Sequence, residues 1–165
     1  MISYKSIKTQ DNFISQDSNL EATIGSGNFR ASIVHLPINK VFNQEIKYFD
    51  SIKDVRINSL IKMPVTVKNI SNFTWSNQPE YNPTNFSYRW IDSTGKLAIF
   101  DGDGERTPLP YNLSPGELTK LNVTIKTPKY PGKYRLILTM VQEGIVWFND
   151  KTNSYTEIPV NVISY

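Results

Sequence analysis

Apolar side chains recur at every second position along several stretches of this chain, and that alternation limits its fold more than any other feature. From residue 61 to residue 68 the odd positions are apolar, whereas the even positions include Lys62, Thr66 and Lys68. Successive side chains of a β-strand point to opposite faces, so this period of two predicts a strand with one buried face. No stretch of about ten or more residues shows the period of an amphipathic helix.

The same alternation returns elsewhere and places more strands. It is seen in residues 86–90, 121–125 and 158–162, and a firm strand candidate also covers residues 29–36. Residues 134–141 carry apolar side chains on both faces, which is typical of a central strand covered on both sides. Pro159 lies within the last run, and it predicts an edge strand or a bulge there because proline cannot donate a ladder hydrogen bond.

Glycine and proline separate these segments. Ser114–Glu117 and Tyr130–Lys133 each place proline and then glycine at the two central positions, as a type II turn requires. Asp92–Gly95 is predicted to be a hairpin turn that leads into a strand over residues 96–100. Short strands with turns at these intervals predict an all-β, immunoglobulin-like antiparallel β-sandwich of about 7–9 strands.

The chain of 165 residues is long enough for one such domain, which buries roughly two-thirds of its surface on folding. Residues 1–28 are rich in serine, asparagine, aspartate, glutamine and glycine and end near Gly25-Ser26-Gly27. This composition is typical of a linker, so we predict that residues 1–28 are a linker or loosely ordered lead-in. The sandwich is expected to occupy residues 29–165.

Composition narrows the function classes. The chain has no cysteine, which excludes disulfides and thiolate chemistry. Its net charge of +3 comes from lysines and arginines spread singly along the sequence, so we expect no nucleic-acid partner. No apolar run approaches the roughly 20 residues that span a bilayer, so we expect no membrane span. The first residues lack the apolar core of a signal peptide, and a cytoplasmic location is expected.

Side chains suited to catalysis are scarce. His35 is the only histidine, and it lies in an apolar segment, so we interpret it as structural. Glu143 and Asp150 bracket Trp147 and Phe148, and such a carboxylate pair leaves glycoside hydrolysis open as a less favoured alternative. We therefore expect a binding protein rather than an enzyme, with no cofactor and no resident metal.

Three acidic residues alternate within one short loop, at Asp101, Asp103 and Glu105. Oxygen ligands spaced in this way suit calcium, but Asn112 stands where an EF-hand loop has its last glutamate, and no helices flank the loop. A glycine-rich loop with solvated acids is the simpler interpretation, and calcium binding stays open.

Aromatic residues are the most informative class. Trp90 lies inside an alternating strand and is expected in the core. Trp75 and Trp147 lie near strand ends, where an exposed ring can stack on a sugar. The candidate ligand-binding residues are Trp75, Tyr88 and Trp147 as stacking platforms and Asp101, Asp103 and Glu105 as acceptors for sugar hydroxyl groups.

Four segments of residues 60–150 carry a family resemblance: PVTVKNISNFTW, FSYRWIDSTGK, ERTPLPYNLSPGE and TPKYPGKYRLILTMVQEGIVWF. They resemble an immunoglobulin-like accessory module of bacterial polysaccharide-biosynthesis proteins, which occurs beside glycosyltransferase or methyltransferase domains. More distantly, they are similar to the four-tryptophan module of autophagy receptors. Within the first segment, Asn69 ends a strand, and its side chain can bond to neighbouring backbone groups.

The resemblance implies a non-catalytic β-sandwich associated with cell-surface glycan assembly. Our first hypothesis is therefore an accessory module that recognises polysaccharide or docks a neighbouring glycosyltransferase domain. The second is a protein–protein interaction module that uses an exposed sheet edge or an apolar patch. Exposure of Trp75 and Trp147 distinguishes the two, because solvent-facing rings favour a sugar ligand and buried rings favour a protein partner.

Overall fold

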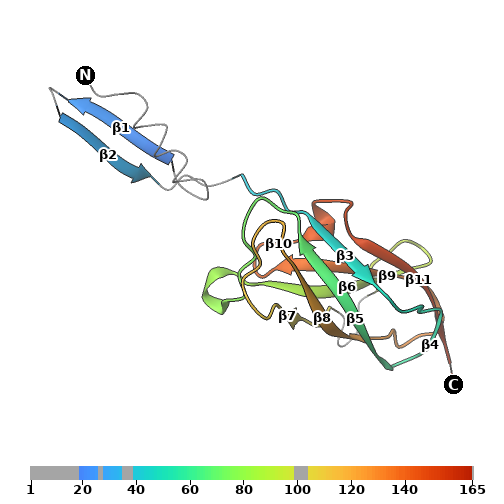
Figure 1. Ribbon diagram of the computed structural model, residues 1–165. Coiled ribbons are helices and arrows are strands. Elements are labelled where there is room, and N and C mark those ends of the chain that lie inside the picture. Colours follow the sequence, from blue (N-terminus) through green and yellow to red (C-terminus); the bar gives the residue numbers. More distant parts are fainter. Residues whose placement is uncertain (1–18, 26–27, 35–38, 99–103, 165) are drawn as a thin grey trace. The chain divides into compact units, whose positions relative to one another are not determined.

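The computed structural model describes residues 19–25, 28–34, 39–98 and 104–164, with the backbone alone described for the first two ranges. The chain divides into two compact units, Met1–Lys40 and Val41–Tyr165. In the first unit, β1 (Asn19–Gly25) and β2 (Asn28–Val34) form an antiparallel two-stranded sheet (Figure 1).

The unit boundary differs from the expected one. The strand candidate at residues 29–36 is present over residues 29–34 as part of β2, and β2 pairs with β1, which lies in the expected linker. The second unit begins at Val41, not at residue 29. An alternating pattern identifies a strand without naming its partner, which explains the difference. His35 lies outside the described residues.

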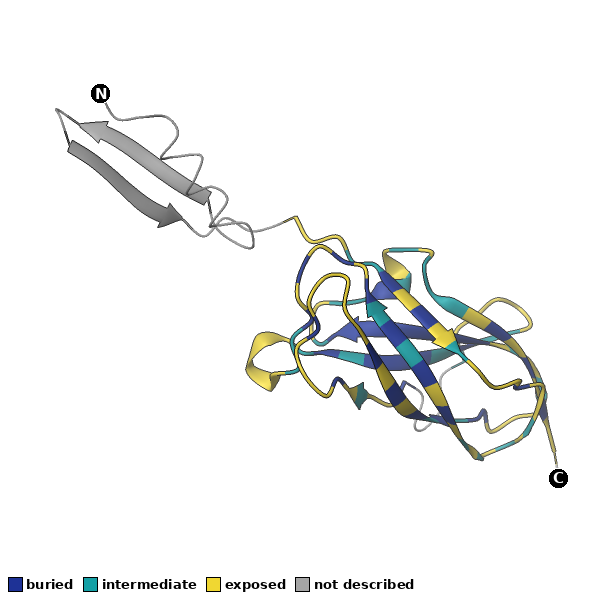
Figure 2. Cartoon of the chain, in the orientation of Figure 1, coloured by how far each residue is buried: buried dark blue, intermediate teal, exposed yellow. Residues whose placement is uncertain are grey.

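One layer of the second unit is a three-stranded antiparallel sheet. It has the order β3 (Gln44–Tyr48), β5 (Leu60–Asn69) and β8 (Leu118–Lys126). In Figure 1 this sheet faces the reader, with the other sheet behind it. Burial alternates along β5 and β8, as Figure 2 shows, so each strand presents one face to the core and one to solvent.

The other layer is a six-stranded sheet. Its path is β4 (Asp54–Arg56), β11 (Thr156–Ile163), β9 (Gly132–Gln142), β6 (Thr84–Asp92) and β7 (Thr107–Pro108), and β10 (Val146–Trp147) also pairs with β9. The 3₁₀ turns η1 (Pro79–Tyr81) and η2 (Phe148–Asp150) lie in connections. β4 and β11 are parallel, unlike the wholly antiparallel sheet expected, and β4 reaches only Asn161–Ile163. At Pro159 β11 is therefore an edge strand, as predicted.

The inner faces of both sheets enclose one hydrophobic core, which confirms an all-β, immunoglobulin-like sandwich. β6 and β9 pair so that Phe86, Tyr88 and Trp90 lie opposite Met140, Leu138 and Leu136. All six of these side chains are buried. β9 is buried on both faces from Leu136 onward, as expected of a central strand.

Two of the three predicted turns are present. Ser114–Glu117 closes through a hydrogen bond from Glu117 N to Ser114 O of 3.0 Å, and Gly116 has a φ of 87°. The Asp92–Gly95 turn closes in the same way, from Gly95 N to Asp92 O at 3.0 Å. The Pro-Gly pair at residues 131–132 forms no such turn, because Gly132 is already the first residue of β9 and pairs with Val162.

The helical segments of the described ranges are the two short 3₁₀ turns η1 and η2. No helix within them has the length and apolar character needed to cross a bilayer.

Candidate functional site

Two of the three expected stacking rings lie in the core. Trp75 is fully buried, its indole Nε1 donates to Ser71 Oγ at 3.1 Å, and its ring packs edge-on against Phe148 at a centroid distance of 5.5 Å. Tyr88 is also fully buried, and its hydroxyl accepts a hydrogen bond of 2.9 Å from Lys126 N. Neither ring presents a face to a ligand, so the hypothesis that Trp75 and Tyr88 are stacking platforms is wrong.

Strand phase explains the correction for Tyr88, and a long-range backbone pairing explains the one for Trp75. Tyr88 lies two residues from Phe86 and from Trp90 on β6, so it must share their inward face. The alternation of apolar residues in the sequence therefore already indicated that Tyr88 faces the core. Trp75 follows β5, and it is drawn inward because its backbone pairs with Leu113 through two hydrogen bonds of 2.9 Å. That contact joins distant segments, and no local pattern predicts it.

Trp147 lies on the opposite, outer face of the six-stranded sheet. It pairs with Val141 of β9, whose neighbour Met140 faces the core, and it is half-buried. Two guanidinium groups lie over its indole ring: Cζ of Arg89 is 4.0 Å from the ring centroid, and Cζ of Arg106 is 4.6 Å from it. Such cation–π contacts hold the ring in place.

Each of these arginines also forms an ion pair. Arg89 Nη1 lies 2.7 Å from Asp150 Oδ1, and Arg106 Nε lies 2.7 Å from Glu143 Oε1. Asn85 Nδ2 donates a second hydrogen bond of 2.9 Å to the same Glu143 oxygen. We call Asn85, Arg89, Arg106, Glu143, Trp147 and Asp150 the Trp147 cluster.

The Trp147 cluster lowers the pKa of its partly buried carboxylate, Glu143. Partial burial alone raises the pKa of Glu143, but hydrogen bonds from Arg106 and Asn85 and the positive charge of Arg106 outweigh it. The net pKa of Glu143 is therefore below the ordinary glutamate value.

The acidic loop ends against the Trp147 cluster. Gly104 O accepts hydrogen bonds from Ser87 Oγ, at 2.9 Å, and from Arg106 Nη1. A Cβ on Gly104 would lie 3.0 Å from Trp147 Cη2, so the indole packs against bare backbone there. Glu105 is exposed, whereas Asp101 and Asp103 lie outside the described residues. The structure thus brings Trp147 and the Gly104–Glu105 end of the loop together.

Sequence reasoning missed Asn85 and Arg89, although a signal for both was present. They lie on β6 at positions that alternate with Phe86, Tyr88 and Trp90, so they must point away from the core. Their position beside Trp147 depends on the β6–β9 register, which the sequence does not reveal.

Glu143 and Asp150 each form an ion pair with an arginine, and they are not arranged as the carboxyl pair of a glycoside hydrolase. A glycosidase needs one carboxyl group whose raised pKa keeps it protonated as a general acid. Glu143 has the opposite shift, and Asp150 is bound to Arg89. Among residues 39–98 and 104–164, no group of three or more histidine, cysteine, aspartate or glutamate residues could hold a metal ion.

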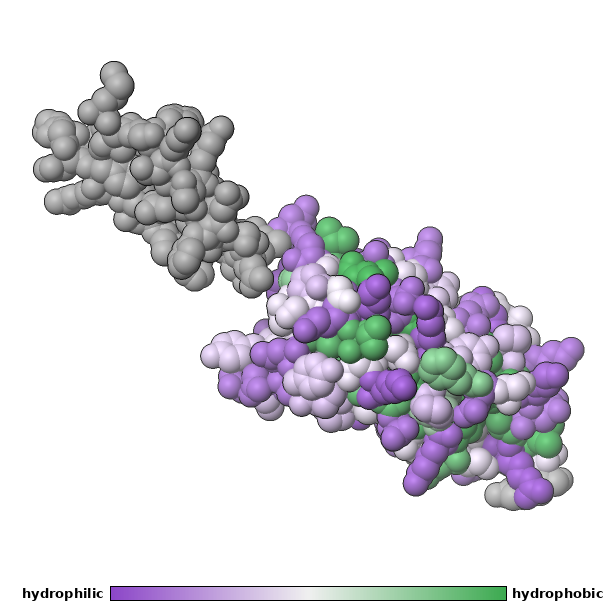
Figure 3. Space-filling view, viewed as in Figure 1, coloured by the Kyte–Doolittle hydropathy of each residue, from purple (hydrophilic) through white to green (hydrophobic). Residues whose placement is uncertain are grey.

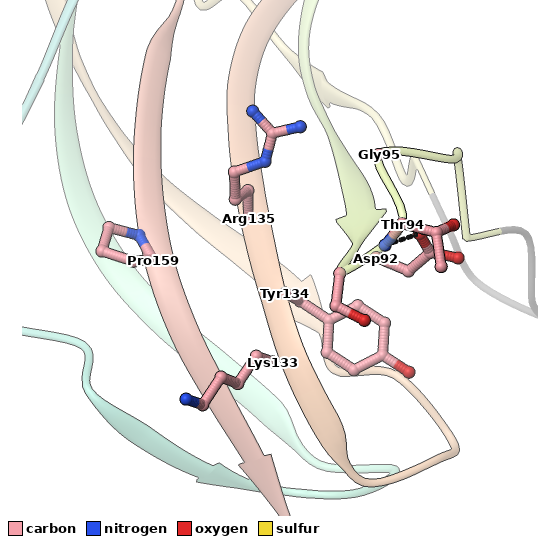
Figure 4. A pocket seen from close by; sticks show the side chains of 8 residues that line it. Asp92, Thr94, Gly95, Lys133, Tyr134, Arg135 and Pro159 are labelled. Carbon is pink, nitrogen blue, oxygen red and sulfur yellow. Dashed lines mark hydrogen bonds between the residues drawn. The ribbon is translucent and has the colours of Figure 1, made fainter.

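A hollow of about 500 Å³ lies at the other end of the same sheet, beside the Asp92–Gly95 turn and β9 (Figure 4). Hydrogen bonds from Thr94 and Lys96 hold the pKa of the Asp92 carboxyl below its usual value. Arg135 pairs with Glu157 at 3.1 Å, and the Tyr134 hydroxyl donates to Tyr130 O at 3.1 Å. Arginine–carboxylate pairs are present at both places, and the Trp147 cluster is the stronger candidate because it adds a partly exposed indole.

The fold and the cluster together define a β-sandwich with a polar, arginine-rich site on one outer face. No protein-family model matches the chain, and no curated protein matches it in sequence.

Solved structures give weak similarities. The solution structure of a CARDB domain from Pyrococcus furiosus is 23% identical, over 73% of this chain and 93% of that one, with a TM-score of 0.42. A crystal structure of that domain with di-metal ions covers 86% of its chain with a TM-score of 0.38. A β-glucosidase from Listeria innocua in complex with glucose is 16% identical over 16% of its chain, with a TM-score of 0.43. Similarities at this level add nothing on what the chain binds.

Proposed function

We propose that the sandwich is a non-catalytic accessory module of bacterial cell-surface polysaccharide biosynthesis, and that it recognises glycan at the Trp147 cluster. The observation that carries this proposal is the partly exposed indole of Trp147, which two arginines and their carboxylate partners surround on the outer face of the sheet. The association with polysaccharide assembly rests on the sequence resemblance.

The chemistry of the Trp147 cluster suits sugar hydroxyl groups. Guanidinium N–H groups donate hydrogen bonds, and carboxylate oxygens accept them, so each ion pair offers both kinds of partner side by side. Within the described part of the chain, no residue accepts a hydrogen bond from the indole Nε1 of Trp147, which leaves this donor for a ligand. Because the two guanidinium groups already lie over the indole ring, the sugar would be held by hydrogen bonds to the indole N–H and to these charged groups rather than by stacking.

Titration by NMR tests this proposal directly. The indole N–H signals of Trp75, Trp90 and Trp147 can be followed while oligosaccharides from surface polysaccharides are added to the full chain. We expect the Trp147 signal to shift with ligand and the other two to stay still, because Trp75 and Trp90 donate to internal acceptors at 3.1 and 2.9 Å. Trp147→Phe assigns the signal, and Arg89→Gln should weaken binding several-fold. If none of the three indole signals shifts with any of the oligosaccharides, glycan recognition at this cluster is rejected.

Docking of a protein strand is the second candidate. The outer edge of β3 is partly covered, since Thr156 Oγ1 donates to Ile46 O at 2.6 Å and Ser154 Oγ accepts from Gln44 N at 3.2 Å. β8 is the longer edge of that sheet, but it carries Lys120 and Lys126, and charged lysines protect edge strands from pairing. Strand addition is therefore less favoured than glycan recognition.

A further inference from the structure

The outer face of the three-stranded sheet gathers lysines from strands far apart in the sequence. Outward positions of each strand alternate with the buried ones, and β3, β5 and β8 pair in a fixed register. Lysines on outward positions of this face, which we call the lysine face, are Lys47, Lys62, Lys68, Lys120 and Lys126. Residues that look scattered along the chain thus form one basic surface.

Few carboxylates neutralise the lysine face. Glu45 is the single acidic residue on outward positions of its three strands, and it lies 3.3 Å from Lys47. Within the described ranges, Lys62, Lys68, Lys120 and Lys126 form no ion pair. The six-stranded sheet is different, because its outer arginines Arg89 and Arg135 each hold a carboxylate.

The register divides the lysines into two groups. Thr66 of β5 lies opposite Lys47 on one side and Lys120 on the other, and Lys68 follows two residues later. At the other end, Lys126 of β8 pairs with Leu60 of β5, which is two residues before Lys62 on the same strand. Lys62 and Lys68 are six residues apart on one strand, so the two groups are separated by roughly 20 Å. A ligand that contacts both groups must be an extended polymer with repeated negative charge.

The other side chains on the lysine face favour an acidic polysaccharide over nucleic acid. Its strands place neither an arginine nor an aromatic ring on outward positions, whereas binding of single-stranded nucleic acid relies on aromatic stacking and bidentate phosphate contacts on arginine. Pro64 and Asn122 lie on outward positions between the two groups, and Thr66 and Thr124 lie beside the lysines of each group. Asn122 and the threonines can bond to sugar hydroxyl groups.

The lysine face also differs from a membrane-binding surface. Its exposed apolar side chains, Leu60 and Leu118, lie at opposite ends of the sheet, because Leu60 pairs with Lys126 and Leu118 with Lys68. Figure 3 shows this side of the molecule as largely hydrophilic, with separate apolar patches. Insertion into a bilayer needs a contiguous apolar face, which these strands do not provide.

We propose that the lysine face binds an extended acidic polysaccharide whose carboxylates contact both lysine groups. This surface lies on the opposite layer from the Trp147 cluster, so this proposal can be tested independently of glycan recognition at that cluster.

Titration of the full chain with polygalacturonate tests the proposal, with neutral dextran as the uncharged control. We expect saturable binding of polygalacturonate that weakens as salt is added, because exposed charge pairs are screened. Oligogalacturonides too short to span roughly 20 Å should bind more weakly than longer ones.

A matched pair of variants locates the site. Lys68→Gln combined with Lys120→Gln removes two charges from the lysine face, and binding should weaken roughly five- to tenfold. Lys133→Gln combined with Lys151→Gln removes the same charge from exposed positions elsewhere and should change binding less than twofold. Circular dichroism checks that both variants fold.

Three outcomes would overturn the proposal. One is an equal loss of affinity in both double variants, which would show attraction by net charge alone. Another is tighter binding of single-stranded DNA or of anionic phospholipid vesicles than of polygalacturonate at the same salt concentration. The third is an absence of polygalacturonate binding at low salt.

Discussion

Asn69 shows how a single buried side chain joins distant parts of this sandwich. It ends β5 and is fully buried. Its Nδ2 donates to Phe73 O at 2.8 Å and to Leu113 O at 2.7 Å, and its Oδ1 accepts from Ser71 N at 2.9 Å. The sequence interpretation, in which this asparagine bonds to neighbouring backbone groups, is confirmed. The contact with Leu113 also fixes the segment that pairs with Trp75.

Replacing Asn69 with alanine should destabilise the protein by about 2–3 kcal/mol. The change removes three buried hydrogen bonds and takes from Ser71 N its acceptor, Asn69 Oδ1, whereas Leu113 O keeps its bond from Trp75 N. Loss of buried hydrogen bonds is costly. Urea denaturation measures the loss. Asn122→Ala, at an exposed position on β8, is the matched control and should change stability by less than about 0.5 kcal/mol. Equal effects of the two substitutions would contradict the role given to Asn69.

At the scale of elements, short segments outside the main strands complete the outer face of the six-stranded sheet. β10 carries Trp147 onto this face, and the connection before β10 carries Glu143 to Arg106. η2 follows directly and supplies Asp150 to Arg89. The Trp147 cluster therefore depends on the β9–β10 hairpin, which brings Glu143 to Arg106, and on η2, which brings Asp150 to Arg89.

The ion pair of Glu143 predicts a pH dependence of stability. Because the pKa of Glu143 is lower in the folded chain than its ordinary value of 4.5, the carboxylate stabilises the fold above that pH. This contribution is lost as the pH falls through the folded-state pKa. Glu143→Gln should therefore be less stable than wild type near about pH 6, and the difference should shrink toward about pH 3.

Denaturant titrations at a series of pH values measure this difference. Glu80→Gln, at an exposed position in η1, removes one negative charge without disturbing an ion pair of the described residues and serves as the control. A difference between wild type and Glu143→Gln that stays constant from neutral to acidic pH would show that the ion pair with Arg106 does not stabilise the fold.

At the scale of the whole molecule, the sequence predicts local structure well and long-range partners poorly. Alternation locates β5, β6, β8, β9 and β11 and shows which side chains face inward, because strand phase is a local property. It does not predict that β2 pairs with β1, that β4 runs parallel to β11, or that Trp75 bridges to Leu113. These pairings depend on which strands meet in space.

The same distinction applies to the two proposed binding surfaces. Trp147 could be chosen from its place near a strand end, but its two arginines come from β6 and from the segment before β7. The lysine face needs the register of three strands before its residues can be grouped. Because these lysines are far apart in the sequence, the sequence alone does not show that they share one surface.

The central claim is that the core takes up Trp75, Trp90 and Tyr88, so that Trp147 alone among the tryptophans lies at the surface for recognition. Hydrogen exchange of the indole N–H groups, followed by NMR in the native state, tests it most directly. We predict slow exchange for Trp75 and Trp90, which are buried and hydrogen-bonded to Ser71 and to the Lys126 carbonyl, and fast exchange for Trp147. Exchange of Trp75 as fast as that of Trp147 would contradict the account.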